Sequence, residues 1–290
     1  MESPKRVSIG ICCVHNNETD RPQLESMQLL QIIAIEHEIE IVNFQEFSQP
    51  NFPVVTSSSR RSLVKWREAQ RRYELQWNSY LTGGGGITRT LRKLISYSGQ
   101  LVFKLNTRRS SVLKSEWRAR AIETFVTNKH MNGVRRAHEL KMDGLIILEV
   151  DAYSNENSRE GLSAIMSKLK YEVTTPLYLN IAGGLPPDQL GIQRLGHRYE
   201  NEPFVSYLKP VTNTSCSYLL NRKFIAAFIE WTVSNPDKQA LGIDWVFNCF
   251  FMDSKFEIKS LHSDPPALTH GSFSGLTKSW NPKNQPSSRR

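Results

Sequence analysis

The sequence predicts an α/β fold in which a mostly parallel central sheet is flanked by helices and carries a basic helical insert. Leu145 to Leu148 form an apolar run without alternation, which is typical of a strand buried on both faces. The chain from Arg6 to Phe44 follows the order strand, polar loop, helix, strand, which opens a nucleotide-binding α/β unit. An uneven distribution of charge predicts the insert.

Composition places the chain among ordinary globular proteins, since 39% of its residues are hydrophobic and 22% are charged. The most apolar windows are the length of a strand, well short of the ~20 residues that a bilayer requires. The N-terminus shows no long apolar signal region, so we expect a cytoplasmic protein without a transmembrane segment. The cysteines lack CxxC spacing, and Cys12 and Cys13, adjacent on a strand, point to opposite faces; we therefore expect reduced core thiols.

The net charge of +9 is concentrated in one segment. Arg60 to Arg120 contains fifteen Lys and Arg and three Glu, or +12, which leaves 22 basic and 25 acidic residues, or −3, elsewhere. We expect one domain over residues 1–290 with a basic, mainly helical insert at 60–125 and a flexible tail at 281–290. An anionic partner is the natural inference from the insert.

The first elements of the chain alternate between strands and one helix. Arg6 to Val14 is predicted as a buried strand, followed by a polar loop that contains Asn16 and Asn17. A helix from about Gln23 to Ile33 and a strand from Glu38 to Phe44 come next. Neither a GxGxxG nor a GxxxxGK[ST] motif is present, so the dinucleotide fingerprint and the P-loop are both excluded.

Helical spacing continues through the insert, over residues 62–80, 87–97 and 110–125, with a glycine run at 83–86 that is typical of a linker. Arginines beside Trp and Tyr can bind phosphates and stack bases, can lie on an anionic membrane surface, or can simply pack as amphipathic helices. The candidates for contact with an anionic acceptor are Arg67, Arg71, Arg72, Arg108 and Arg109.

The second half of the chain again alternates helices and strands. Helices are predicted at 127–141, 160–170 and 221–233, and strands at 176–181 and 204–210. The first of these helices leads directly into the apolar strand that begins at Leu145, as in the crossover of a parallel sheet.

That strand ends in two acids, Glu149 and Asp151. Their spacing of two predicts that both carboxylates project from the same side of the strand's end, where an open α/β sheet binds ligands. Two close carboxylates repel each other, so a cation between them would stabilise the pair, and oxygen ligands suit Mg²⁺ or Mn²⁺. The alternative is an acidic strand end that is merely solvated.

Four segments of the second half of the chain carry a resemblance to a known family: Thr127-Asn128-Lys129-His130, Leu145 to Asp151, Ser217 to Lys223 and Gly242-Ile243-Asp244-Trp245. Together they resemble glycosyltransferase family 25, which includes lipooligosaccharide and collagen galactosyltransferases of the GT-A fold. Val150 stands where that family has an Asp between the two acids, and Lys129-His130 stands in place of Ser-His.

The segment from Thr269 to Trp280 is similar to the closing His, Gly, Lys-Pro-Trp signature of glycogenin-like GT-A enzymes, with Ser279 in place of the Pro. The similarity implies that His270 is a metal ligand and that Lys278 contacts the diphosphate of the donor. Without it, His270 would be an ordinary loop histidine.

Together these resemblances imply a GT-A-like, metal-dependent glycosyltransferase that transfers a sugar from a nucleotide-sugar donor, a UDP-sugar, to an acceptor hydroxyl. Glu149, Asp151 and His270 would hold Mn²⁺ or Mg²⁺, which neutralises the leaving diphosphate. Asp244 would be the base of an inverting reaction, since an apolar context raises a carboxyl pKa, or else a helix N-cap ahead of Trp245.

Asn16, Asn17, Lys129 and His130 are weaker candidates for contact with the donor. The acceptor would be a glycan or a lipid-linked glycan from the resemblance, or a hydroxymethylated DNA base from the basic insert. The competing hypothesis is a non-catalytic nucleic-acid-binding protein that keeps a GT-A-like fold, for which Val150 is the hint.

Overall fold

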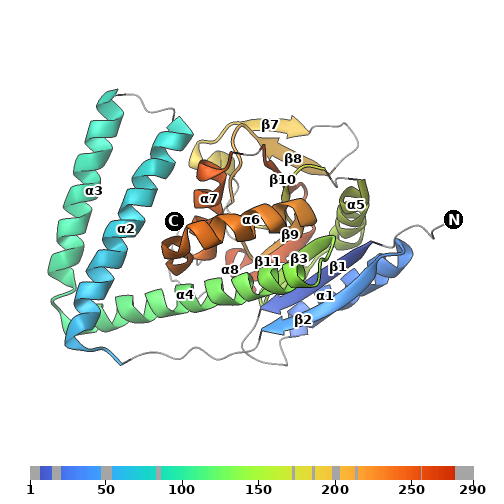
Figure 1. Cartoon of the computed structure of the whole chain (residues 1–290), viewed down its shortest axis with the longest axis horizontal. Helices are drawn as coiled ribbons and strands as arrows, with labels where there is room; N and C mark the ends of the chain where they lie inside the picture. Colours follow the sequence, from blue (N-terminus) through green and yellow to red (C-terminus); the bar gives the residue numbers. More distant parts are fainter. Residues whose placement is uncertain are drawn as a thin grey trace.

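The computed structural model describes residues 7–14, 21–46, 54–82, 86–171, 174–184, 187–197, 203–212, 215–255 and 257–277. Within these residues an eight-stranded sheet and a three-stranded sheet are surrounded by helices (Figure 1), so the predicted α/β class is confirmed. The predicted tail at 281–290 and the glycines at 83–85 lie outside the described residues.

The elements follow the order expected of alternating strands and helices. The first half contains β1 (Ser8–Val14), α1 (Arg21–Glu36), β2 (Glu40–Glu46), α2 (Ser57–Thr82), α3 (Gly86–Asn106), α4 (Ser110–Glu139), β3 (Gly144–Glu149), β4 (Ala152–Ser154) and α5 (Ser158–Tyr171). The second half contains β5 (Leu177–Asn180), β6 (Ala182–Gly183), η1 (Pro187–Leu190), β7 (Arg194–His197), β8 (Phe204–Tyr207), β9 (Ser217–Asn221), α6 (Arg222–Ser234), η2 (Pro236–Ala240), α7 (Ile243–Asp253), β10 (Lys259–Ser263), β11 (Leu268–His270) and α8 (Gly271–Ser274).

The large sheet is mixed, so the prediction of a mostly parallel sheet was wrong. Its strand order is β2-β1-β3-β9-β5-β10-β8-β7. The pairs β1–β2, β1–β3 and β5–β10 are parallel, whereas β3–β9, β5–β9, β8–β10 and β7–β8 are antiparallel. Strand β9 has no crossover helix before it, and it runs antiparallel between β3 and β5. Burial on both faces had suggested parallel neighbours, but helices can cover both faces of a mixed sheet as well.

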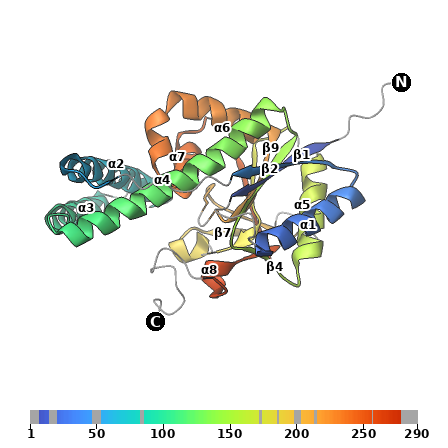
Figure 2. The same ribbon diagram turned by 90° about the horizontal axis from the view of Figure 1, so that it is seen from below.

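Strand β3 lies at the middle of the core, as the unbroken apolar run predicts. Ile146 and Leu148 pack with α1 and α5 on one face, and Leu145 and Ile147 pack with α4, α6 and α7 on the other. Figure 2 shows these two helical layers on either side of the sheet. All four side chains are fully buried, which at about 25 cal/mol per Å² of apolar surface makes this strand a main contributor to stability.

The cysteines behave as the sequence predicts. All four are free and buried. Cys13 lies in the cluster with α1, and its neighbour Cys12 lies in the cluster with α4, so adjacent residues on β1 do face opposite sides of the sheet.

Helix α4 joins the insert to the sheet and is one continuous element of 30 residues, where the sequence had suggested two helices. Its second half packs against β1 and β3. Gly133 makes that packing close, because a Cβ at this position would lie 2.7 Å from the Cys12 sulfur. The first half extends away from the sheet, and α2 and α3 stand beside each other at that end of the molecule (Figure 1).

Helix α2 attaches the insert to the body of the protein. The indole of Trp66 donates to the carbonyl of Ala240 at 3.1 Å, and the Tyr73 hydroxyl donates to Asp237 at 2.7 Å. Trp77 is buried against Ile192 and Val211. In the described helices, none is both long and apolar enough to cross a bilayer.

Candidate metal centre

A sharp turn follows the central strand and carries the chain into a second, smaller sheet. Strand β3 ends at Glu149, Val150 and Asp151 form the turn, and β4 begins at Ala152. Strand β11 pairs with β4 in antiparallel register, His270 opposite Ala152, and runs parallel to β6 on its other side. This pairing brings His270 next to Asp151 from a distant part of the sequence.

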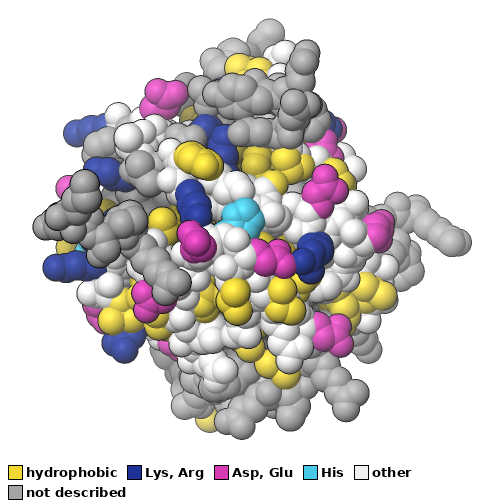
Figure 3. All heavy atoms as spheres, turned by 90° about the vertical axis from the view of Figure 1, so that its right-hand side faces the viewer, with side chains coloured by type: hydrophobic (Ala, Val, Ile, Leu, Met, Phe, Trp, Pro, Cys, Tyr) yellow, Lys and Arg dark blue, Asp and Glu magenta, His cyan; other side chains and the backbone are white. Residues whose placement is uncertain are grey.

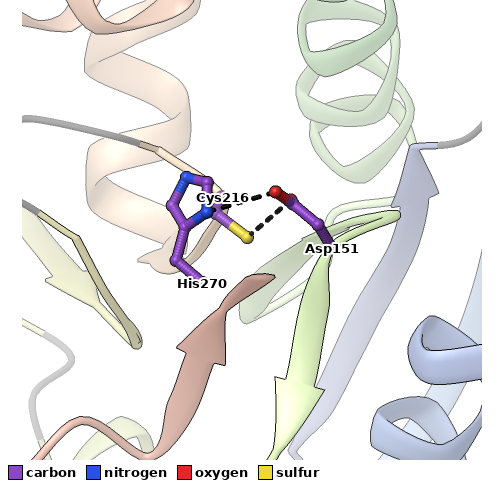
Figure 4. A group of neighbouring side chains, drawn as sticks. All are labelled: Asp151, Cys216 and His270. Carbon is purple, nitrogen blue, oxygen red and sulfur yellow. Dashed lines mark hydrogen bonds and ion pairs between the residues drawn. The ribbon is translucent and has the colours of Figure 1, made fainter. Parts of the chain in front are cut away.

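Asp151, Cys216 and His270 point toward one another at this place (Figure 4). His270 Nδ1 lies 3.1 Å from Asp151 Oδ2, and the Cys216 thiol donates to Asp151 Oδ1 at 3.2 Å. One ligand atom from each residue lies within 4.8 Å of the others, close enough for all three to bind one ion. None of the three is more than 9% exposed.

The segment after His270 fixes the carboxylate from a third side. The Ser272 hydroxyl donates to Asp151 Oδ2 at 2.7 Å, and the Ser272 amide approaches the same oxygen at 3.3 Å. The amide of Gly271 donates to the Asp151 carbonyl at 2.8 Å. The Asp151 side chain is therefore held at both oxygens and at its backbone, as a preorganised ligand would be.

The electrostatics of the three groups depend on one another. Burial would raise the pKa of Asp151, but hydrogen bonds from His270, Ser272 and Cys216 hold that pKa well below its usual range. Burial would lower the pKa of His270, yet its contact with Asp151 leaves that pKa raised. Burial and the nearby charges of Asp151 and Glu149 raise the pKa of the Cys216 thiol far above its usual value, so the thiol is neutral.

Glu149 does not join this group, and the prediction that it shares one side with Asp151 was wrong. Its carboxylate lies 3.0 Å from Nε2 of His130, without the alignment of a hydrogen bond, and Nδ1 of His130 lies 2.7 Å from the Tyr218 hydroxyl. Because β3 ends at Glu149, the alternation of a strand does not extend to Asp151. Among the described residues, Cys216 takes the place that had been expected for Glu149 beside Asp151 and His270.

Asp244 is tied to the same centre through the residue before Cys216. Its Oδ1 accepts from the Ser215 amide at 2.9 Å and also from the Ser215 hydroxyl. Two adjacent residues, Ser215 and Cys216, thus contact the two acids Asp244 and Asp151. Helix α7 begins at Ile243 with Gly242 as N-cap, so Asp244 lies in the first turn and is not the N-cap.

A chain of hydroxyls supports Ser215 from the core. Ser215 Oγ lies 3.0 Å from Thr212 Oγ1, which lies 2.6 Å from the hydroxyl of Tyr178. Tyr178 is fully buried and stacks on Tyr218 with ring centroids 5.6 Å apart. Since Tyr218 also contacts His130, the surroundings of Asp244 and of Glu149 meet at this pair of tyrosines.

The structure places the other predicted site residues as follows. Lys129 is buried on α4, with its ammonium 4.5 Å from the centre of the Phe125 ring, one residue before His130. Asn16, Asn17 and Lys278 lie outside the described residues. The five arginines of the insert lie on α2 and at the junction of α3 and α4.

Two of those arginines make contacts within the insert. Arg67 forms an ion pair with Glu74 at 2.8 Å, and the guanidinium of Arg71 stacks on Tyr97 at 4.3 Å. Arg72, Arg108 and Arg109 are exposed. The interpretation of the arginines as parts of packed amphipathic helices therefore holds for Arg67 and Arg71.

Sequence reasoning missed Cys216, Ser215 and Ser272. Cys216 reaches Asp151 because β9 pairs with β3 in antiparallel register, and the Glu149 amide donates to the Cys216 carbonyl at 2.8 Å. No spacing in the sequence marks that pairing. Ser272 lies two residues after His270, so the closing segment did contain a signal, although its role as a donor to Asp151 required the turn geometry.

Comparison of the chain with protein-family models gave no match, and comparison with curated proteins gave none either.

Proposed function

We propose that this protein is a metal-dependent glycosyltransferase with a GT-A-like fold that moves a sugar from a nucleotide-sugar donor, a UDP-sugar, to an acceptor hydroxyl. The observation that carries the proposal is the meeting of Asp151 with His270 at the carboxyl end of β3, beside an Asp244 that is held by Ser215. The resemblance of the sequence assigned metal binding to the first two residues and catalysis to the third. Open α/β sheets bind ligands at this end of their strands.

The donor set favours some ions over others. A carboxylate and an imidazole suit Mn²⁺ better than Mg²⁺, which prefers oxygen ligands, and a thiolate in addition would suit Zn²⁺. Because the Cys216 thiol donates to Asp151 Oδ1, we assign it the role of orienting the carboxylate of a Mn²⁺ site formed with His270. A divalent ion bound there would neutralise the charge that develops on the departing nucleoside diphosphate.

Asp244 is the proposed base for the acceptor hydroxyl. Asp244 lies in the first turn of α7, where the amide groups of the helix N-terminus attract negative charge. Ser215 fixes the orientation of that carboxylate through its amide and its hydroxyl. Removal of a positioned base costs typically 10²- to 10⁴-fold in rate, so Asp244→Asn should lower kcat by about that factor.

The test is thermal unfolding with a panel of nucleoside diphosphates and nucleotide sugars, each with Mn²⁺, Mg²⁺, Zn²⁺ or EDTA. A ligand that binds only the folded state stabilises it by about 2.7 kcal/mol at a hundred times its Kd. We expect one nucleotide to raise the midpoint in the presence of Mn²⁺ and not in EDTA. If no nucleotide and no metal changes the midpoint, the assignment fails.

The role of Cys216 has its own test. Cys216→Ser keeps a hydroxyl that can donate to Asp151, so Mn²⁺ binding should persist with a modest loss. If instead the thiolate is a ligand, Co²⁺ bound to the wild type will show a sulfur charge-transfer band that disappears in Cys216→Ser, and the centre is then of the zinc type.

A non-catalytic nucleic-acid-binding protein is the second candidate, because the exposed cations of the insert favour an anionic partner. It predicts DNA affinity that falls steeply with salt and is unchanged in a variant with both Asp151→Asn and Asp244→Asn. The glycosyltransferase proposal predicts that the same double variant loses transfer of the sugar to a glycan acceptor. The two measurements separate the candidates.

A further inference from the structure

Helix α3 exposes a row of aliphatic side chains on the side that faces away from α2. We define the α3 stripe as Leu91, Leu94, Ile95, Leu101, Val102 and Leu105. Their exposed fractions run from 48% to 62%. The spacing of three, four and seven residues puts them on one face of the helix. A contiguous exposed apolar surface of this kind marks an interaction site.

The opposite face of α3 is the one that packs against α2. Gln100 is buried there, Arg71 donates to the Ser96 hydroxyl at 3.4 Å, and the ammonium of Lys104 lies 2.8 Å from Glu68. In Figure 1, α3 is the outermost element at its end of the molecule. The stripe is therefore directed outward from the protein.

Exposed cations follow the stripe beyond the C-terminal end of α3, and two acids of the insert are paired. Glu68 and Glu74 are paired with Lys104 and Arg67 within the insert. The exposed cations of the turn after α3 and of the start of α4 are Arg108, Arg109, Lys114 and Arg118. By contrast, the face at the other end of the molecule mixes cationic and anionic side chains, as Figure 3 shows.

We propose that α3 lies on the surface of an anionic lipid bilayer, with the stripe at the boundary of the acyl chains and the flanking cations among the headgroups. An aliphatic helix face with exposed cations next to its end is the chemistry that such a surface recognises. This inference goes beyond the transfer reaction proposed above and does not depend on it.

The charge of the insert and the apolar character of the stripe argue against two other partners, a second copy of the chain and duplex DNA. A second copy docked through the stripe would bring together two segments of +12 each, and their repulsion would oppose the contact. Duplex DNA would engage the cations but would leave the aliphatic side chains in water, because its phosphates offer them no apolar contact. Of these three surfaces, the bilayer is the one that offers partners for both.

The experiment is co-sedimentation of the full chain with vesicles of phosphatidylcholine alone or with phosphatidylserine in a ratio of about three to one, in EDTA. We expect binding to the anionic vesicles that weakens with salt. Leu94→Ser with Leu101→Ser should lower the partition coefficient about tenfold. The matched control is Ile35→Ser with Val233→Ser, which removes two aliphatic side chains from α1 and α6 that are more exposed than Leu94 and Leu101 and should leave binding unchanged.

Equal loss of binding in the stripe variant and in the control would overturn the proposal, and so would the absence of wild-type binding to anionic vesicles. A dimer in sedimentation velocity that disappears in the stripe variant would assign the stripe to a second copy and also overturn it. Thermal midpoints of both variants should match the wild type, because all four residues are exposed. Since EDTA removes any divalent ion, failure here is distinguishable from failure of the proposed metal centre.

Discussion

At the scale of residues, the candidate metal centre is defined by what each side chain contacts. Asp151 accepts from a thiol and a hydroxyl and contacts an imidazole, whereas the carboxylate of Glu149, two residues away, lies beside the imidazole of His130. The difference arises from the turn at Val150, which ends the strand before Asp151.

Asp151→Asn should abolish the rise in thermal midpoint that Mn²⁺ produces. The amide keeps the shape of the side chain but removes the negative charge that a cation requires. Differential scanning fluorimetry with a Mn²⁺ titration measures the effect. Asp253→Asn is the matched control, since it removes a surface carboxylate that pairs with Lys238 and should leave the response to Mn²⁺ intact. An unchanged response in Asp151→Asn would contradict the assignment.

The buried imidazole of His262 should make the free energy of unfolding depend on pH. Burial in the core lowers its pKa from 6.5 to about 4, and the hydrogen bond of Nε2 to the carbonyl of Val211, at 3.2 Å, only partly opposes that shift. The unfolded chain therefore binds a proton between pH 6.5 and about 4 that the folded chain does not. The stability contributed by the neutral ring is complete above pH 6.5 and is lost as pH falls through that window, by about 3 kcal/mol.

Urea unfolding between pH 7 and 4 measures this dependence. The free energy of unfolding of His262→Gln should decline less over that range, since glutamine does not titrate. His138→Gln, at an exposed position near the end of α4, should decline as the wild type does. A parallel decline in all three proteins would show that His262 has no part in acid sensitivity.

At the scale of elements, the small sheet and α8 decide whether the centre forms. Strand β11 carries His270 to β4, and the turn into α8 brings Ser272 to the carboxylate. Gly271 lies between them, and a Cβ there would come within 2.5 Å of the Tyr153 ring and 2.6 Å of the Thr277 hydroxyl. The close approach explains why this position has no side chain.

Gly271→Ala should therefore destabilise the protein by about 1–3 kcal/mol and weaken Mn²⁺ binding, because α8 must shift away from Asp151. Gly99→Ala is the control: nothing lies within 4 Å of a Cβ there, and alanine in the middle of α3 should stabilise by about 0.5–1 kcal/mol. Chemical denaturation and Mn²⁺ titration give both values. We expect the free energy of unfolding to fall in Gly271→Ala and to rise in Gly99→Ala. Equal changes in the two variants would contradict the packing argument.

At the scale of the whole molecule, the insert and the sheet differ in how they are held. The sheet is covered by helices on both faces, whereas α3 packs on α2 and exposes the α3 stripe. Segments with little buried apolar surface open at low free energy.

Hydrogen exchange should report this difference directly. Peptides from α3 should exchange faster than peptides from the second half of α4, which is buried on the sheet. Anionic vesicles should slow exchange in α3 and leave β3 unchanged. Exchange in α3 as slow as in β3 without vesicles would show that another surface covers the stripe.

Much of the fold follows from local pattern. The apolar run before Glu149 predicted a strand buried on both faces, because four apolar residues without alternation require cover on each side. The helices at 21–36, 158–171 and 222–234 lie within a few residues of the predicted ranges, since helical periodicity is a property of neighbouring residues. The uneven charge predicted a basic segment, and its described part is mainly helical, with a turn at 107–109 between α3 and α4.

The α/β class, the central strand and the basic helices follow from the sequence alone, because each depends on residues close together in the chain. The antiparallel pairing of β9 with β3, the contacts of Cys216 and Ser272 with Asp151, and the contact of Glu149 with His130 arise only in the folded chain. These contacts depend on strand register and on a turn of two residues. The register is fixed by packing across the whole sheet, so no short stretch of sequence contains it.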